Sequence, residues 1–338
     1  MIIERITDLI GTTPLMQLDC GVGCSPLYLK LEKFNPGGSM KDRMARGMVE
    51  DAERRGTLKP NGTIVESSSG NTGTGLAMVA AERGYRFIVV VDHHAAPDKI
   101  RAMRAMGAEI VVVDDDGSGK LSTAKREALA EQIAHEQANA VVLRQHKNSA
   151  NGASYVDTLA VDLLRDLPSM DVLVGSVGTG GSLCGTAKGL KRHRPSIHVL
   201  GVEPRGSIIF GGPGGEYYQS GTGVPPGVEI GTVIDYGVID TGCTVDDIAA
   251  FNTCRFIARN YGLLVGGSAG AVIYAAARKK TTMNDISKIC AIIGDGGEKY
   301  LDTIFNDEWM KKNNLYDPRI ETDLASILKP CRHAVMAA

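Results

Sequence analysis

Strand-like and helix-like segments alternate along most of the chain, and this alternation is what most constrains the fold. Short runs rich in β-branched residues, such as GTIVE at 62–66 and YRFIVVVD at 85–92, are each followed by a longer segment that ends in glycine or at a turn. The same order resumes at residue 170 with MDVLVGSV, SIHVLGVEP and KICAIIGD. Apolar strands that alternate with helices are typical of a parallel sheet covered on both faces. The sequence therefore predicts an α/β fold of two doubly wound domains with mostly parallel sheets.

The two sets of strands and helices suggest how the chain is divided. We expect a smaller, movable α/β domain at 40–150, and a larger one formed by 1–39 together with 151–310. A ligand is expected in the cleft between them, where sheet switch points lie. The tail at 311–338 has no strong period and is expected to be partly disordered.

Charge and cysteine usage exclude several classes of partner. The formal net charge of the 338 residues is −2 and the basic residues are scattered, so neither nucleic acid nor an anionic membrane is expected. No apolar run approaches the ~18 residues of a membrane helix, and MIIERITDLIG lacks the features of a secretory signal. We expect a cytoplasmic protein whose seven cysteines are reduced thiols, with no metal site.

Three junctions between a strand and a helix are rich in glycine and hydroxyl residues, at 67–73, 178–182 and 266–270. The first, SSSGNTG, has more hydroxyls than a serine N-cap needs and suits a carboxylate or phosphate at a helix start. The second, GTGGS, resembles a phosphate cradle, although it is neither a Walker A loop nor a complete dinucleotide fingerprint. The third, GGSAG, indicates by itself only an N-cap and close packing.

A lysine, Lys41, follows two glycines and a serine in NPGGSMKDR at 35–43. A lone lysine is normally a solvated surface charge. Combined with a carboxylate-sized site, a phosphate-sized site and Ser268, however, it describes a phosphorylated aldehyde cofactor linked to lysine. That cofactor is pyridoxal 5′-phosphate. A nicotinamide dehydrogenase is an alternative, because Glu203 imitates the ribose-binding acid of a Rossmann unit.

The order and spacing of these motifs resemble one family. TPL near the start, NPGGSMKDR, SSGNTG, GTGGS and GGSAG together are similar to the cysteine synthase/cystathionine β-synthase family of fold-type II pyridoxal phosphate enzymes, whose fold is like that of the tryptophan synthase β subunit. The likeness covers about Ile6 to Met310. It implies amino-acid substrates and a homodimer.

The resemblance also implies a role for each matching position. Lys41 would link the cofactor and shuttle the substrate α-proton, Asn71 would bind the ring 3′-oxygen, and Ser268 would face the ring nitrogen. The substrate α-carboxylate would be bound by Ser68, Ser69, Thr72 and Gln145. The cofactor phosphate would be bound by Gly178, Thr179, Gly180, Gly181 and Ser182.

The reaction that the resemblance implies is β-replacement. Serine cannot keep the ring nitrogen protonated as an aspartate would, so expulsion of a β-substituent is favoured over transamination. O-Acetyl- or O-phospho-L-serine would form an aminoacrylate, to which a nucleophile adds. Arg144 and Arg205 are candidates to pair with a phosphate leaving group or an acceptor carboxylate. His146 is expected to be packed or solvated.

The identity of the nucleophile stays open at this point. Sulfide is the common acceptor in the family, and homocysteine is a second candidate. The stretches GGSMKDR and GSIIFGG resemble those of enzymes that join O-phosphoserine to glutamate. A third candidate acceptor is therefore an amine (glutamate or ammonia), which would give a 2,3-diaminopropionate precursor. The motifs are also compatible with a serine/threonine dehydratase-type lyase or with a non-catalytic regulator.

Overall fold

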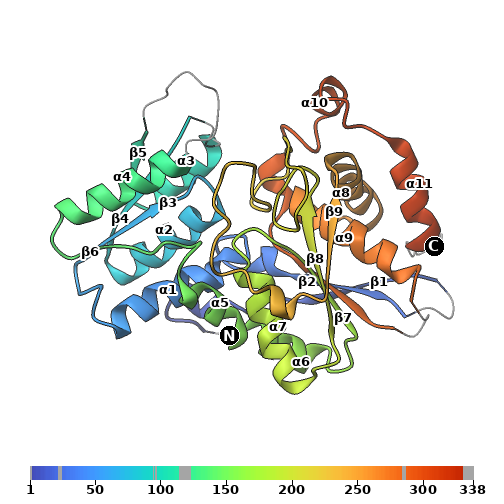
Figure 1. The fold of residues 1–338 in the computed structure, drawn as a ribbon, viewed down its shortest axis with the longest axis horizontal. Helices are drawn as coiled ribbons and strands as arrows, with labels where there is room; N and C mark the ends of the chain where they lie inside the picture. The colour runs from blue at the N-terminus through green and yellow to red at the C-terminus, as the bar shows by residue number, and fades with distance from the viewer. Residues whose placement is uncertain are drawn as a thin grey trace.

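In the computed structural model, the described residues are 2–21, 25–93, 95, 97–113, 123–283 and 287–329. They form one four-stranded and one six-stranded sheet, each flanked by helices (Figure 1). All neighbouring strands are parallel except the pair β1 and β2. The expected α/β fold with mostly parallel sheets is confirmed.

The smaller sheet has the strand order β5-β4-β3-β6. Its strands are β3 (Thr63–Ser67), β4 (Arg86–Val91), β5 (Glu109–Val112) and β6 (Ala140–Val142). The helices around it are α2 (Asn71–Arg83), α3 (Pro97–Ala105) and α4 (Thr123–Glu136). Alternate residues of β4 face opposite sides: Phe87 and Val89 pack with α2, whereas Ile88 and Val90 pack beneath α4. We call these seven elements the small lobe.

The larger sheet has the order β1-β2-β10-β7-β8-β9. Its strands are β1 (Leu15–Leu18), β2 (Leu27–Leu31), β7 (Val172–Ser176), β8 (His198–Pro204), β9 (Thr241–Val245) and β10 (Ile289–Ile293). Its helices are α5 (Ser149–Val156), α6 (Leu159–Asp166), α7 (Gly181–His193), α8 (Asp247–Tyr261), α9 (Gly267–Lys280), α10 (Asp307–Lys312) and α11 (Pro318–Ile327). Four short 3-10 helices are η1 (Ile6–Leu9), η2 (Glu32–Phe34), η3 (Tyr236–Val238) and η4 (Gly297–Tyr300). These elements form the large lobe.

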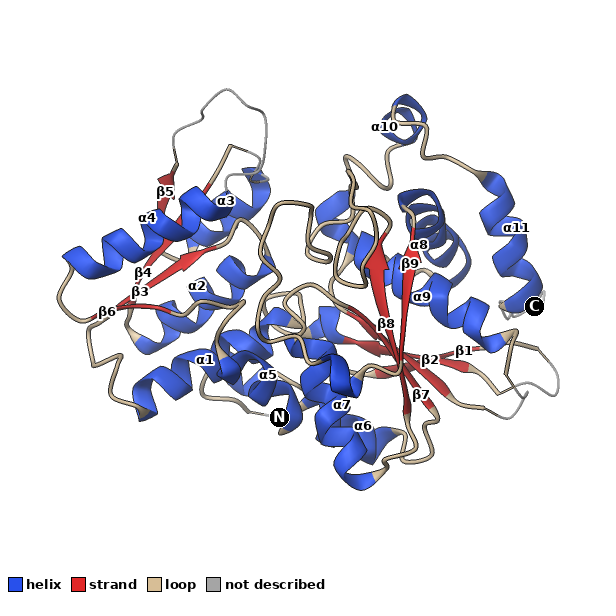
Figure 2. Ribbon diagram, viewed as in Figure 1, coloured by secondary structure: helices blue, strands red, loops and turns tan. Residues whose placement is uncertain are grey.

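The larger sheet is covered on both faces, as Figure 2 shows for the helices around its strands. Leu173 of β7 and Ile292 of β10 pack with α5, α6 and α7 on one face. Val174 and Ala291, which point the other way, pack with α8 and α9. Such a two-sided core explains why these strands are apolar throughout.

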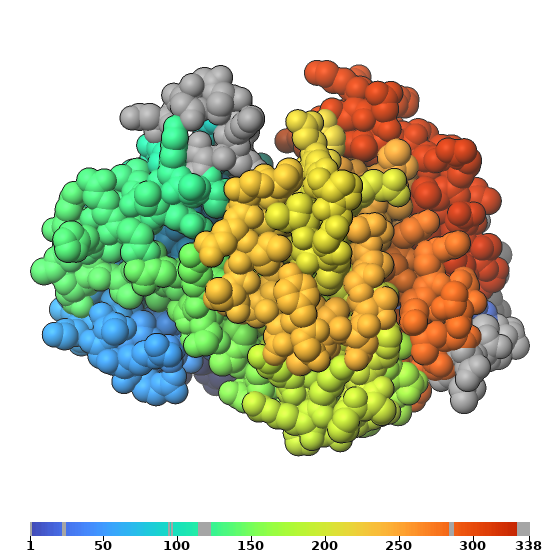
Figure 3. All heavy atoms as spheres, in the orientation of Figure 1, coloured from blue at the N-terminus to red at the C-terminus, as the bar shows by residue number. Residues whose placement is uncertain are grey.

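Helix α1 (Lys41–Arg54) joins the two lobes, because it packs against α2 of the small lobe and α5 of the large lobe. In the space-filling view, residues of the two lobes also lie directly against one another (Figure 3). The start of α1 is therefore held from both sides.

The segment after residue 310 contains more structure than its sequence pattern indicates. Asp317 caps α11 by accepting the N–H of Arg319, and Leu324 and Leu328 are fully buried in the core formed with α8 and α9. Residues 330–338 of the expected tail lie outside the described residues. Within the described part of the chain, no helix is long and apolar enough to cross a membrane.

Candidate active site

The glycine-rich loops follow the carboxyl ends of parallel strands, where ligands bind in open α/β sheets. One loop joins β3 to α2, and another joins β7 to α7. A third segment, after β10, lies beside the start of α9, since the N–H of Gly266 donates to the carbonyl of Asp295 at 3.2 Å. The topology thus brings the three predicted junctions to one region.

Lys41 is the first residue of α1 and is only 9% exposed. Its backbone N–H donates to Ser39 Oγ at 3.2 Å, and the N–H of Met40 donates to the carbonyl of Gly294 at 2.8 Å. Its Nζ has no hydrogen bond or ion pair with the described residues. Burial lowers the pKa of Lys41 to about 8, although the charge of Asp295 acts in the opposite direction. Such an amine can act as a base or a nucleophile near neutral pH.

The position of Lys41 depends on a buried ion-pair network two residues further along α1. Arg43 donates from Nε and Nη2 to the two carboxylate oxygens of Glu32, at 2.7 and 2.9 Å. Its Nη2 also donates to Asp162 of α6 at 2.8 Å. Tyr155 of α5 donates its hydroxyl to the carbonyl of Met40 at 2.8 Å. These contacts attach the start of α1 to the large lobe.

The loop between β3 and α2 brings together the residues expected to bind a carboxylate. Ser68 Oγ accepts the N–H groups of Gly70, the N-cap residue of α2, and of Gly73 in its first turn, at 3.3 and 3.2 Å. Thr72 donates its hydroxyl to Gln145 Oε1 at 2.7 Å, which attaches the loop after β6 to the start of α2.

The third serine of this loop has a cation beside it. Arg126 of α4 lies with Nη1 3.4 Å from Ser69 Oγ, and its Nε is 3.4 Å from Asp92 Oδ2. Sequence reasoning missed Arg126, because it lies among the many polar and charged residues of α4 and resembles any surface arginine.

The second loop leads into α7 through two positions that favour glycine. Gly180 has a left-handed backbone (φ 85°), and a Cβ on Gly181 would lie 1.9 Å from Asn151 Oδ1. Asn151 donates to the carbonyl of Gln145 at 2.7 Å and to Thr179 Oγ1 at 3.1 Å. It therefore connects the predicted carboxylate and phosphate loops. The first N–H groups of a helix have no partners within it and favour an anion.

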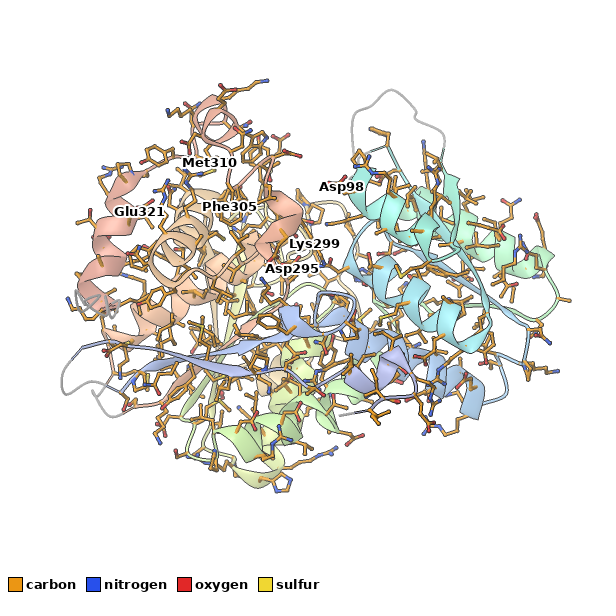
Figure 4. All side chains as sticks on the ribbon, turned by 180° about the vertical axis from the view of Figure 1, so that it is seen from behind. Asp98, Asp295, Lys299, Phe305, Met310 and Glu321 are labelled. Carbon is orange, nitrogen blue, oxygen red and sulfur yellow. The ribbon has the colours of Figure 1, made fainter. Side chains whose placement is uncertain are left out.

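The third loop places Ser268 at the second position of α9, where it is 7% exposed. Next to this helix start lies Asp295, whose carboxylate accepts a hydrogen bond from Asn71 Nδ2 at 2.9 Å. Lys299 donates to Asn71 Oδ1 at 2.7 Å. Viewed from behind, Asp295 and Lys299 lie on the large lobe facing the small lobe (Figure 4). Neither residue was singled out from the sequence.

The two arginines proposed as anion partners lie elsewhere. Arg144 pairs with the exposed Glu131 at 2.5 Å, and the side chain of Arg205 is 75% exposed and 3.5 Å from Asp246. His146, by contrast, is half-buried: desolvation and then the charges of Lys41, Arg126 and Lys147 lower the pKa of His146 to about 4. This imidazole is neutral at physiological pH.

The hydrogen bonds of Glu203 argue against the dehydrogenase alternative. It is fully buried, and its two carboxylate oxygens accept the N–H groups of Ile209 and Phe210, at 3.0 and 3.2 Å. Both oxygens are engaged by the loop that follows β8, so Glu203 is not free to bind a ribose.

Comparison with known proteins defines the class. A family model described as "Pyridoxal-phosphate dependent enzyme" matches residues 6–295, and the chain belongs to this family. It is 52% identical, over 96% of its length and 97% of the other's, to a protein of Sinorhizobium fredii named "Putative cysteine synthase". It is 35% identical over 96% of its length to the cystathionine beta-synthase of Apis mellifera, of which it spans 65%. A hydrogen sulfide-producing enzyme of Fusobacterium nucleatum, 34% identical, superposes with a TM-score of 0.83 over 88% of this chain and 98% of that one. The chain is thus a pyridoxal-phosphate-dependent β-replacement enzyme of the cysteine synthase and cystathionine β-synthase type.

The residues present fit this cofactor. A buried amine without a partner among the described residues, at Lys41, suits a covalent link to an aldehyde. The start of α7, with Thr179 and Ser182, would hold the phosphate, while Asn71 and Ser268 would contact the ring. When bound, pyridoxal phosphate withdraws electrons from the substrate Cα, so that the α-proton and a β-substituent can leave.

Proposed function

We propose that this chain replaces the β-substituent of an O-activated L-serine, either O-acetyl- or O-phospho-L-serine, with a nucleophile. Lys41 removes the α-proton and later returns it. The α-carboxylate is held by Ser68, Ser69, Thr72 and Gln145, and the cofactor phosphate by Gly178, Thr179, Gly180, Gly181 and Ser182. The observation that carries this proposal is the buried amine of Lys41, which has no hydrogen bond or ion pair with the described residues. Its pKa of about 8 suits proton transfer.

Among the two leaving groups, the contacts of Arg126 favour phosphate. This arginine is the cation beside Ser69, and its side chain is only 11% exposed. A partly buried guanidinium binds phosphate oxygens more strongly than an acetyl ester, because charge-assisted hydrogen bonds are the stronger kind. Arg126 replaces Arg144 and Arg205 as the residue proposed for this contact.

For the acceptor, the relatives named cysteine synthase support sulfide. Homocysteine and an amine such as glutamate or ammonia are the alternatives, and a dehydratase-type lyase would need no acceptor. The loop at 206–226 borders the phosphate loop, since a Cβ on Gly178 would lie 3.2 Å from the carbonyl oxygen of Gly221.

We propose further that the protein is a cytoplasmic homodimer and that the small lobe moves when the substrate binds.

The test is the visible absorption spectrum of the cofactor-loaded protein with each serine ester in turn. We expect O-phospho-L-serine to replace the band of the bound cofactor with a new band. Sulfide, homocysteine, glutamate and ammonia are then added separately, and the acceptor is the one that restores the first band. Pyruvate formed without an acceptor would instead indicate a lyase. A Lys41→Ala variant should show none of these changes, whereas Lys191→Ala, which alters a partly exposed ion pair with Asp240, should behave as the parent protein.

A further inference from the structure

Asp295 lies where three segments of the site meet. It follows β10 and forms an isolated antiparallel bridge with Ser39, two residues before Lys41. Its carbonyl accepts the N–H of Gly266, next to the start of α9. Its carboxylate oxygen Oδ2 accepts hydrogen bonds from Asn71 at 2.9 Å and from the Tyr300 hydroxyl at 2.8 Å. One residue thus contacts the loop before Lys41, the start of α9 and helix α2 of the small lobe.

The other carboxylate oxygen of Asp295 has no hydrogen-bond partner among the described residues. The residue is only 2% exposed, and no described cation forms an ion pair with it. A buried carboxylate left partly unsatisfied costs free energy. The two hydrogen bonds that Oδ2 accepts from Asn71 and Tyr300 offset part of this cost.

Asn71 is held between a hydrogen-bond acceptor and a donor. Its Nδ2 donates to Asp295, and its Oδ1 accepts from Lys299, which also donates to the carbonyl of Gly38 at 3.2 Å. If the amide turned over, its oxygen would face the carboxylate and its nitrogen would face the ammonium. Only one orientation satisfies both neighbours, and it leaves one N–H of Nδ2 available to another acceptor.

We propose that Asp295 is a positioning residue of the active site: it fixes the amide of Asn71 so that one N–H stays available to the cofactor, and its negative charge stabilises the protonated amine of Lys41. The first half rests on the proposed function, in which Asn71 contacts the cofactor. The second half concerns the chain alone. It is supported by the backbone bridge between Asp295 and Ser39, two residues before Lys41, and by the burial of both side chains. The charge of Asp295 accordingly acts to raise the pKa of Lys41, against the larger effect of burial.

Several charged or titratable groups surround this pair. His146 lies near Lys41, from the loop after β6. Around Asp295 are Tyr300, Lys99 of α3, whose Nζ lies 5.5 Å from the centre of the Tyr300 ring, and Cys254 of α8. The Asp295 charge also acts to raise the pKa values of Tyr300, Lys99 and Cys254. The labelling of Lys41 itself is therefore the readout of the effect on this lysine.

The first measurement uses cofactor-free protein, with no substrate. Lys41 is labelled with acetic anhydride across pH 6–10, and the labelled peptide is quantified by mass spectrometry. Asp295→Asn keeps the size and an acceptor oxygen but removes the charge, so the labelling midpoint of Lys41 should fall by roughly 1 pH unit. The matched control is Glu298→Gln, which removes an equal charge three residues away, where the carboxylate pairs with Lys33. An unchanged midpoint in Asp295→Asn, or an equal shift in the control, overturns the charge role.

The second measurement is cofactor affinity by absorbance titration. Asp295→Ala removes the acceptor and should weaken binding by roughly tenfold, whereas Asp295→Asn should bind nearly as the parent does. Asn71→Ala should weaken binding similarly, and the double variant should be no weaker than the worse single one. Additive losses, or unchanged binding in Asp295→Ala, overturn the positioning role. If Asp295→Ala does not fold, Lys299→Met tests the other side of the amide.

The two measurements separate this proposal from the proposed function. A midpoint shift in a protein that binds cofactor but acts on neither serine ester would support Asp295 and reject the reaction. An active protein whose Lys41 midpoint ignores Asp295 would reject the role of Asp295 alone.

Discussion

Replacing Arg43 should destabilise the protein through the partner left behind. The side chains of Arg43 and Glu32 are 1% and 0% exposed and are joined by two hydrogen bonds of 2.7 and 2.9 Å. In Arg43→Met, Glu32 keeps its contacts with Thr13 (2.7 Å) and Asn35 (2.9 Å) but loses its cation. Removing one member of a buried ion pair costs about 3–5 kcal/mol of unfolding free energy. We expect a loss of this size.

The loss should also depend on pH in a defined direction. Burial raises the pKa of Glu32, but the hydrogen bond and charge of Arg43, with Thr13 and Asn35, outweigh it, so the net pKa lies below the ordinary 4.5. The ionised Glu32 therefore adds stability above pH 4.5, which is lost as pH falls through the lower folded value. Without Arg43, burial prevails and the folded pKa rises above the unfolded one. The variant then loses stability as pH increases through 4.5, and its deficit grows towards pH 7.

The assay is urea unfolding of the parent and the variant at pH 5 and pH 7. Arg54→Met is the control, because the Arg54 side chain is 75% exposed in its pair with Asp51 and such pairs contribute about 0–1 kcal/mol. Arg43→Met combined with Glu32→Leu should recover part of the loss, since no charge is then left buried. The reasoning is refuted if Arg43→Met costs no more than Arg54→Met, or if its deficit is the same at both pH values.

Three further predictions concern the site itself. Arg126→Gln should lower kcat/KM for O-phospho-L-serine by roughly tenfold or more while affecting O-acetyl-L-serine less; equal losses in steady-state kinetics would contradict the proposed contact. Gly181→Ala should lower the free energy of unfolding in urea by about 1–3 kcal/mol and weaken cofactor binding, because the added Cβ would lie 1.9 Å from Asn151 Oδ1. Gly152→Ala is the control: a Cβ there has its nearest neighbour at 3.7 Å, so this change should be neutral or stabilising. The rate of cofactor attachment should rise with pH up to about 8 and then level, as the Lys41 amine loses its proton; a rate that is flat from pH 6 to 9 would be inconsistent with a free amine of this pKa.

The alternation of strands and helices could be read from the sequence because it is a local property. Strands β3, β4, β7, β8 and β10 and helices α2, α7, α8 and α9 each carry their pattern within a dozen residues. The antiparallel pair β1 and β2 was not predicted, because it lies before the point where strands and helices begin to alternate. Helix α11 was missed as well, because its apolar contacts are few and its N-cap, Asp317, resembles any loop aspartate.

The same holds for the active site: its glycine-rich loops could be predicted from the sequence, whereas its buried charged residues could not. Glycines and hydroxyls cluster at a helix start for a reason that acts over a few residues, so those motifs can be recognised locally. Arg43, Arg126 and Asp295 have no such local mark, because a charged residue is normally solvated. What distinguishes them is burial beside a partner far along the chain: Asp295 and Asn71 are 224 residues apart. The loops therefore indicate which cofactor binds, while the residues that position Lys41 and Asn71 are found only once both lobes are assembled.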